Sequence, residues 1–338
     1  MGHSYASIEK ILFKDFRIQD PNPMSVSSPP PFQRRFLMPQ YWGIWFGVLI
    51  LWLLAHLPWP MQRLMGQGIG ECFWSLGKRR RSDTLINLGL CFPELSEAER
   101  ILMGKDVFRN AAIGIFESLS AWYAPKRFDK SVTISGLEHL IAAQKRGHGV
   151  LLLGGHYSTL DQGGYLSSLF FEATVVYRPQ NNPLLEWLIT RARANIFPHQ
   201  IDHDDMRGLI TALKSGQIVW YSPDQDFGLK LGVMAPFFGV PAATVVAPRR
   251  LIKINNSAIL AFHSYRVDDV EPKYHITITP ELSDYPSEDP VVDATRVNAL
   301  FEELIRIAPT QWMWFHRRFK SQPKGTLSPY ALAKQQQQ

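Results

Sequence analysis

The sequence predicts an α/β protein with a mixed, mostly parallel sheet flanked by helices and preceded by an N-terminal membrane helix. Three observations lead to this prediction. Short apolar runs alternate with segments of helical periodicity over most of the chain, which is the pattern of βαβ units. The run Gly149–Gly154 has only Val and Leu between its glycines, as is typical of a strand buried on both faces of a parallel sheet. Residues 36–62 carry no Asp, Glu, Lys or Arg.

The composition is that of a folded protein with an anionic partner. Apolar residues make up 46% of the 338 residues and charged residues 20%, which excludes a mainly disordered chain because so much apolar surface can be buried. The net charge of +6 and the pI of about 9.2 suit nucleic acid, anionic lipid or an acidic carrier protein. Cys72 and Cys91 are too few for a disulfide framework and lack metal-ligand spacing, so we expect a reducing compartment.

The N-terminal region is expected to associate with a membrane. Residues 1–35 have the composition of a disordered polar leader. The uncharged run from Gln40 to Leu57 would be roughly 27 Å long as a helix, close to the thickness of the hydrocarbon layer. A buried core helix is the alternative, but such a helix seldom lacks charge on every side. We therefore expect a transmembrane or membrane-embedded helix within 36–62.

Basic residues flank this predicted helix on both sides, so they do not fix its orientation. Arg34 and Arg35 precede it, and Arg63 and the cluster Lys78–Arg81 follow it. This arrangement fits a helix that dips into the interface. It also fits a helix that spans the bilayer and is followed by a basic amphipathic segment, residues 63–82, on the cytoplasmic face.

Residues 83–325 are expected to form one α/β domain, followed by a loose tail at 326–338. Strands are predicted at 132–135, 149–154, 173–177, 218–221, 257–263 and 274–279. Helices are predicted at 97–122, 137–145, 183–193, 206–215, 240–252 and 294–307.

A histidine and an aspartate follow the buried strand. His156 lies just past Gly154, and Asp161 lies where the next helix should begin. In open α/β sheets, ligands bind outside the carboxyl ends of the strands. An aspartate on one imidazole nitrogen fixes the tautomer and stabilises the charged ring, which leaves the other nitrogen to act as a general base. This spacing is common by chance, so the pairing needs support from the rest of the chain.

The His156 and Asp161 pair resembles the catalytic motif of the glycerolipid acyltransferase superfamily. Stretches downstream resemble its lipid A branch, the late Kdo-dependent lauroyl and myristoyl acyltransferases, in the same order. They are Tyr177–Trp187, Met206–Lys214, Trp220–Gly228, Pro236–Ala242 and Gln311–Lys320. With the N-terminal apolar helix, the resemblance covers most of residues 40–325. The chain departs from it at Asp161, where the lipid A branch usually has Glu, and at Pro198–Asp205, which lacks the expected basic character.

The resemblance implies a catalytic domain at 83–325 that moves a fatty acyl group from an acyl carrier protein thioester to a hydroxyl. The acceptor would be a Kdo-bearing lipid A precursor of lipopolysaccharide biosynthesis, at the cytoplasmic face of a bacterial inner membrane. His156 would take the hydroxyl proton, and Asp161 would hold His156. The reaction needs no metal and no cofactor.

Four more residues are candidates for substrate binding. Arg178 follows a predicted strand, and its guanidinium matches the oxygens of a phosphate. Asp224, Gln225 and Asp226 follow another predicted strand, and their side chains suit sugar hydroxyls or the ordering of the site. The sequence there, Ser-Pro-Asp-Gln, is also a good turn.

Other functions remain open on the residues alone. His199 and His203 have the spacing of metal ligands on a helix, but Pro198 and the neighbouring acids disfavour a helix there. Stacking on nucleic acid is disfavoured because the aromatic residues gather in the apolar helix and near the C-terminus. A glycerophospholipid precursor as acceptor, or a non-enzymatic membrane-tethered lipid-binding protein, remains the alternative.

Overall fold

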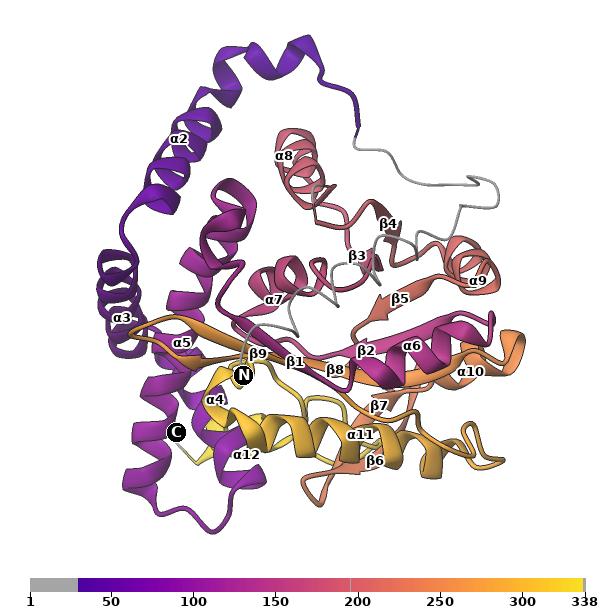
Figure 1. Ribbon diagram of the computed structural model, residues 1–338. Helices are drawn as coiled ribbons and strands as arrows, with labels where there is room; N and C mark the ends of the chain where they lie inside the picture. Colours follow the sequence, from indigo (N-terminus) through magenta and orange to yellow (C-terminus); the bar gives the residue numbers. More distant parts are fainter. Residues whose placement is uncertain (1–29, 195, 337–338) are drawn as a thin grey trace, which may run out of the picture.

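The protein is built on a seven-stranded sheet and a separate two-stranded hairpin (Figure 1). The computed structural model describes residues 30–194 and 196–336. The sheet has the order β1, β9, β8, β2, β5, β3, β4; β9 is antiparallel to β8, and all other neighbours are parallel. Its strands are β1 (Val132–Ser135), β2 (Val150–Gly154), β3 (Thr174–Tyr177), β4 (His199–Asp202), β5 (Ile218–Tyr221), β8 (Ala258–Asp268) and β9 (Lys273–Ile278). The predicted mixed, mostly parallel sheet is therefore confirmed.

Helices cover both faces of the sheet. The helices of the α/β part are α5 (Glu97–Tyr123), α6 (Leu137–Lys145), α7 (Leu160–Ser167), α8 (Pro183–Ala194), α9 (Met206–Lys214), α10 (Ala247–Asn255) and α11 (Pro290–Ile307). Leu151 and Leu153 of β2 share one core with α9, α10 and α11, whereas Val150 and Leu152 share the other with α5, α6 and α7. Because β2 is buried along its whole length, it lies at the centre of the molecule, as its apolar sequence predicted.

The predicted membrane helix is wrong as a spanning segment. The apolar run forms α2 (Trp42–His56), whose 15 residues are about 22 Å long, short of a hydrocarbon layer of about 30 Å. No helix within the described residues combines the length and the apolar character that crossing a bilayer requires. The helix ends before Pro58. The buried Gln62 amide donates hydrogen bonds to the carbonyls of Leu54, Ala55 and Leu57. These bonds satisfy the carboxyl end of α2 and fix the bend into the next helix.

The expected interfacial segment at 63–82 is divided between two helices. They are α3 (Trp59–Leu76) and α4 (Lys78–Cys91). α3 packs on α5, and Gly66 and Gly70 allow the close approach, since a Cβ at either would lie less than 3 Å from α5 atoms. The helix thus has one face on the protein and one exposed.

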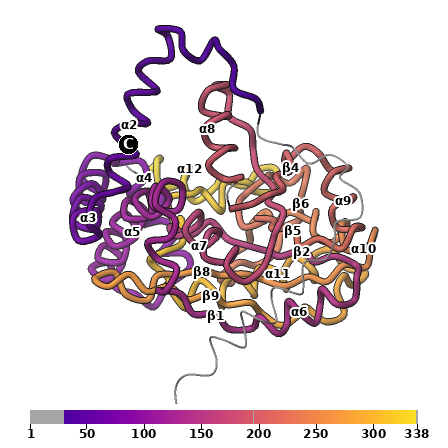
Figure 2. Tube along the Cα trace, turned by 45° about the horizontal axis from the view of Figure 1, so that its top comes forward, coloured from indigo at the N-terminus to yellow at the C-terminus, as the bar shows by residue number. Residues whose placement is uncertain are grey.

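The segment before α2 packs on α8. The indigo segment lies beside α8 in Figure 2, and Phe36 and Tyr41 pack with Leu184 of α8. The Trp45 ring also lies 6.2 Å from that of Trp187. Most of the predicted leader, residues 1–29, lies outside the described residues.

The predicted helix at 240–252 is wrong in its first half. Residues Val240–Val245 form β7, which pairs antiparallel with β6 (Gly232–Phe237), and α10 begins only at Ala247. Phe238 and Gly239 between the two strands both have positive φ, 51° and 73°. This is the geometry of a two-residue hairpin turn whose twist matches that of the strands.

The predicted loose tail differs from the structure as well. Residues Pro329–Gln335 form α12, and Tyr330 within it is buried. Its hydroxyl bonds to Asn87 Oδ1 of α4 at 2.5 Å and accepts from Phe319 N at 3.1 Å. Residues near the end of the chain are thus tied to the N-terminal helices.

Candidate active site

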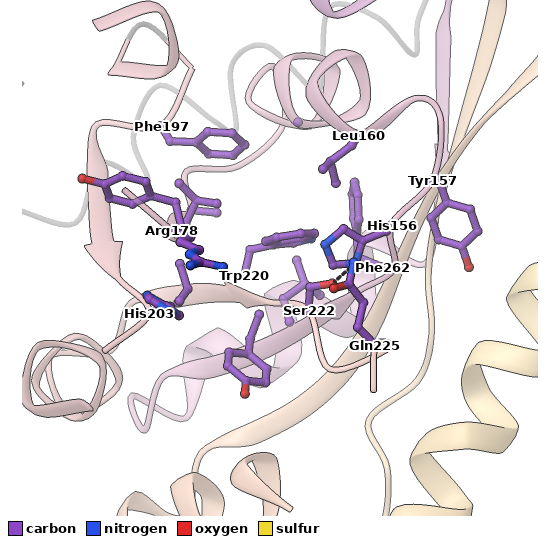
Figure 3. Close-up of a pocket in the computed structure, with 18 of the residues that line it drawn as sticks. His156, Tyr157, Leu160, Arg178, Phe197, His203, Trp220, Ser222, Gln225 and Phe262 are labelled. Carbon is purple, nitrogen blue, oxygen red and sulfur yellow. Dashed lines mark hydrogen bonds between the residues drawn. The ribbon is translucent and has the colours of Figure 1, made fainter. Parts of the chain in front are cut away.

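A cavity of about 800 Å³ opens at the carboxyl ends of β2, β3 and β5. Its floor is the sheet, and its roof is α7 together with the segment after α8. His156, Ser222 and Gln225 line it at one side, and Arg178 and His203 at the other, with the Trp220 ring between (Figure 3). This is the edge of an open parallel sheet at which ligands bind.

His156 is fixed from both its main chain and its ring by one carboxylate. Its Nδ1 lies 2.6 Å from Asp224 Oδ1, and its backbone N donates to Asp224 Oδ2 at 2.7 Å. Since a carboxylate only accepts, Nδ1 carries the hydrogen. The other ring nitrogen, Nε2, has no hydrogen-bond partner in the described part of the chain, and the side chain is 26% exposed. Nε2 is therefore available to a molecule in the cavity.

Asp224 is itself held by two more donors. Ser222 Oγ donates to its Oδ1 at 2.8 Å, and Trp312 Nε1 donates to its Oδ2 at 2.9 Å. Asp224 is only 3% exposed, so these bonds and the two from His156 replace water around the carboxylate. The position of the His156 ring is thus determined by buried contacts.

The carboxylate of Asp224 and the protonated ring of His156 each stabilise the charge on the other. Burial opposes the charge on Asp224, but attraction to His156 and their hydrogen bonds outweigh it and hold the pKa of Asp224 well below its usual range. Burial likewise opposes the charge on His156, but the Asp224 carboxylate outweighs it and raises the pKa of His156. The ring is thus a stronger proton acceptor than an isolated imidazole.

The predicted contact between Asp161 and His156 is not what the structure has. Asp161, in the first turn of α7, instead lies 3.1 Å from Arg193 NH2 of α8 and accepts from Arg193 Nε at 3.2 Å. Both side chains line the cavity. The reason is strand order. β5 lies beside β2, with Leu153 paired to Tyr221, so the chain leaving β5 delivers Asp224 to His156.

The four predicted binding residues have different surroundings. Arg178 and Gln225 line the cavity, and the Arg178 guanidinium has no hydrogen bond or ion pair among the described residues. Asp226 does not line it, because its carboxylate accepts from the backbone N of Gly228 at 2.9 Å and of Ser321 at 2.6 Å. Asp224 is likewise turned to His156. Both carboxylates are thus bonded to protein groups, an arrangement that fits the ordering of the site, and their contact with substrate stays a prediction.

The structure does not place His199 and His203 on one face of a helix, the arrangement in which they would be metal ligands. His199 lies in strand β4, with its Nε2 3.9 Å from Glu172 Oε1. His203 clusters with Asp202 and Asp204 at the rim of the cavity, where ligand atoms of all three lie within 4.8 Å of one another. Hydrogen bonds inside the cluster, such as His203 Nδ1 to Asp202 Oδ1 at 2.9 Å, account for it.

The sequence named Asp224 as a candidate for ordering the site but did not predict its bond to His156, nor the contacts of Ser222 and Trp312 with it. A signal for Asp224 was present, because it follows the end of an apolar strand just as His156 does. Trp312 carries no such signal, because it reaches the site through a bridge between Tyr157 and Trp312 that joins distant segments.

Comparison with known proteins places the chain in a family. Residues 29–321 match the family model described as bacterial lipid A biosynthesis acyltransferase. The chain is 37% identical over 303 residues to the lipid A biosynthesis lauroyltransferase of Escherichia coli K12, covering 89% of this chain and 99% of that protein. It is 38% identical over 301 residues to the palmitoleoyltransferase of the same organism, covering 88% and 98%. Identity to the myristoyltransferase of that organism is 29% over 307 residues, covering 89% and 94%. The chain belongs to the bacterial lipid A biosynthesis acyltransferase family.

Proposed function

We propose that the protein transfers a fatty acyl group from an acyl carrier protein thioester to a hydroxyl of a Kdo-bearing lipid A precursor. The observation that carries this proposal is the His156 ring, whose Nδ1 is held by a buried carboxylate and whose Nε2 is open to the cavity. The names of the relatives, which are lauroyl-, palmitoleoyl- and myristoyltransferases of lipid A biosynthesis, support the reaction class.

His156 acts as the general base in this reaction. Its Nε2 takes the proton of the acceptor hydroxyl as the oxygen attacks the thioester carbonyl. The carbon–sulfur bond then breaks, and the thiolate of the carrier leaves with the proton from the imidazolium. Asp224 is the positioning residue, because it fixes the ring tautomer and stabilises the imidazolium between the two steps. None of these steps calls for a metal or a cofactor.

Asp161 serves the substrate side of the cavity instead. Its ion pair with Arg193 joins α7 to α8 and keeps both walls in place. Arg178 and Gln225 contact the acceptor, Arg178 through a phosphate and Gln225 through sugar hydroxyls. The free guanidinium of Arg178 at the cavity rim supports this assignment, since it can hold phosphate oxygens in a bidentate manner.

The protein lies on the cytoplasmic face of the inner membrane through the exposed faces of α2 and α3. Large apolar side chains stand out on α2, with Trp42 and Phe46 63% and 65% exposed. On α3, Leu64 and Leu76 are 69% and 75% exposed, and the exposed Lys78–Arg80 follows directly. Apolar side chains next to basic ones suit the headgroup region of anionic lipid.

The test is transfer of a labelled acyl group by the purified full chain in mixed micelles. Lauroyl acyl carrier protein is the donor, and a tetra-acylated Kdo-bearing lipid A precursor or lysophosphatidate is offered as acceptor. We expect label in the lipid A precursor. Transfer only to lysophosphatidate would reject the proposed acceptor, and transfer to neither, with the donor intact, would favour a lipid-binding protein without chemistry.

A further inference from the structure

The roof of the cavity contains an aromatic side chain, Phe197, that rests on a glycine of α7. Phe197 lines the cavity away from His156, toward the side of Arg178 (Figure 3). It follows α8 and lines the cavity together with the apolar side chains of Leu160, Val175 and Phe262. A chain attached near His156 and directed along this apolar lining therefore approaches Phe197.

Phe197 rests directly on a glycine in the interior of α7. A Cβ added at Gly164 would lie 2.6 Å from Cζ of Phe197, closer than any real contact. Glycine in a helix interior costs about 1 kcal/mol relative to alanine, so a structural reason is needed for it. The neighbouring Gly163 has its own reason, because a Cβ there would meet Ser264 Oγ at 2.4 Å. The reason for Gly164 is the Phe197 ring.

The backbone N of Phe197 is bonded as well. It donates to the carbonyl of Arg193 at 2.7 Å, and the preceding Ile196 is 4% exposed. Arg193 is in turn held to α7 by its ion pair with Asp161. The ring therefore has a defined position relative to α7, and hence to the sheet on which α7 packs.

We propose that Phe197, seated on Gly164, determines the length of the acyl chain that the protein accepts. This inference rests on the proposed acyl transfer and adds to it the residue that selects the substrate. The methyl end of the acyl chain meets the Phe197 ring, and a longer chain would have to displace a ring that rests on Gly164 and whose backbone N is bonded to Arg193. One methylene too many in an apolar pocket lowers kcat/KM by about 10- to 200-fold. The relatives are named for three different acyl groups, so members of the family differ in this property.

The test compares chain-length profiles of variants. Wild type, Phe197→Ala and Gly164→Ala are assayed for kcat/KM with decanoyl, lauroyl, myristoyl and palmitoyl carrier thioesters. Phe197→Ala should shift the ratio of long-chain to short-chain kcat/KM upward by about tenfold or more. Gly164→Ala should shift it downward, because the new methyl group pushes the ring into the cavity.

Two further variants distinguish a change in chain-length preference from a general loss of activity. In Gly164→Ala/Phe197→Ala, the methyl group at 164 occupies space that the ring has left, so the profile should follow that of Phe197→Ala. Leu185→Ala, on α8 and outside the cavity, is the control and should keep the wild-type profile. If Phe197→Ala does not fold, Phe197→Leu gives the same comparison with a smaller change in volume.

A binding measurement makes the inference independent of the transfer reaction. Free fatty acids of the same lengths are added, and the increase in melting temperature is recorded for wild type and Phe197→Ala. The length that gives the largest increase should be greater in the variant. Unchanged profiles in both experiments would overturn the role of Phe197 while leaving acyl transfer intact. The wild type could also fail to transfer any acyl group while Phe197→Ala still shifts the preferred length of bound fatty acid. That result would reject the proposed function but not the selection of chain length by Phe197.

Discussion

Two aspartates near the cavity, Asp224 at the sheet edge and Asp161 in the roof, have different surroundings. At the sheet edge, Asp224 is 3% exposed and accepts four hydrogen bonds, two of them from His156. In the roof, Asp161 pairs with Arg193, and both side chains keep contact with solvent, at 14% and 22% exposure. Asp161 is thus nearer to His156 in the sequence, but Asp224 is the aspartate that is bonded to it. The difference teaches that strand order, rather than sequence spacing, selects the partner of His156.

Removal of the His156 ring should have the largest effect on activity. His156→Ala leaves no proton acceptor at the end of β2, so kcat should fall by about 10⁴-fold, at the upper limit for general-base catalysis. The measurement is acyl transfer under saturating donor and acceptor, with circular dichroism to show that the protein is folded. Undiminished activity in the folded variant would contradict the role of His156.

Replacement of the sheet-edge acid should have the next largest effect. Asp224→Asn removes the charge that positions the ring, so kcat should fall by roughly 10²-fold. Unfolding in urea should show a loss of about 1.5 to 3 kcal/mol, since charged hydrogen bonds are broken in a buried place.

The matched control for Asp224→Asn is the neighbouring buried acid. Asp226→Asn loses hydrogen bonds to the backbone N of Gly228 and Ser321 and should lose stability. Its kcat should stay much closer to wild type, because it does not touch His156. Equal losses of kcat in the two variants would mean that Asp224 acts only through stability.

The pH dependence should separate the two sides further. Because Asp224 raises the pKa of His156 above 6.5, kcat should rise with pH through a midpoint above 6.5 as the ring loses its proton. In Asp224→Asn the midpoint should move to lower pH, because burial, which lowers the pKa, remains while the attraction is lost. Rate profiles and the NMR titration of the His156 ring protons both measure this shift. An unmoved midpoint would exclude Asp224 as the cause.

Replacement of the roof acid should have the smallest effect. Asp161→Asn weakens a partly exposed ion pair worth about 1 kcal/mol or less, so kcat should fall less than tenfold and KM should carry most of the change. The pH midpoint should equal that of wild type. If Asp161→Asn moves the midpoint and Asp224→Asn does not, the pairing expected from the sequence is the correct one during catalysis.

Much of the fold follows from local sequence. The run Gly149–Gly154 predicted the buried central strand because a continuous apolar segment between glycines suits only a two-sided environment. The strand at 132–135 and the helix at 137–145 match β1 and α6 residue for residue. The hairpin of β6 and β7 was missed because its turn lacks the usual Asn-Gly or Asp-Gly signal and places Phe238 at positive φ.

The candidate site could be predicted only in part. His156 follows from its place after the buried strand, and Arg178 and Gln225 follow from theirs after β3 and β5. The partner of His156 could not be derived, because the local alternative, Asp161, is also an aspartate and is much nearer in sequence. Trp312, which bonds Asp224, comes from a segment far along the chain.

By itself, the sequence determined the apolar centre of the sheet, the histidine at its edge and the excess of basic residues that suits anionic partners. The tertiary structure alone decided what each polar group at that edge does. It placed β5 beside β2 and so gave His156 the carboxylate of Asp224, and it placed α8 over α7 and so gave Asp161 to Arg193. The physical reason is that a hydrogen bond depends on distances of about 3 Å, and only the packing of remote segments sets those distances.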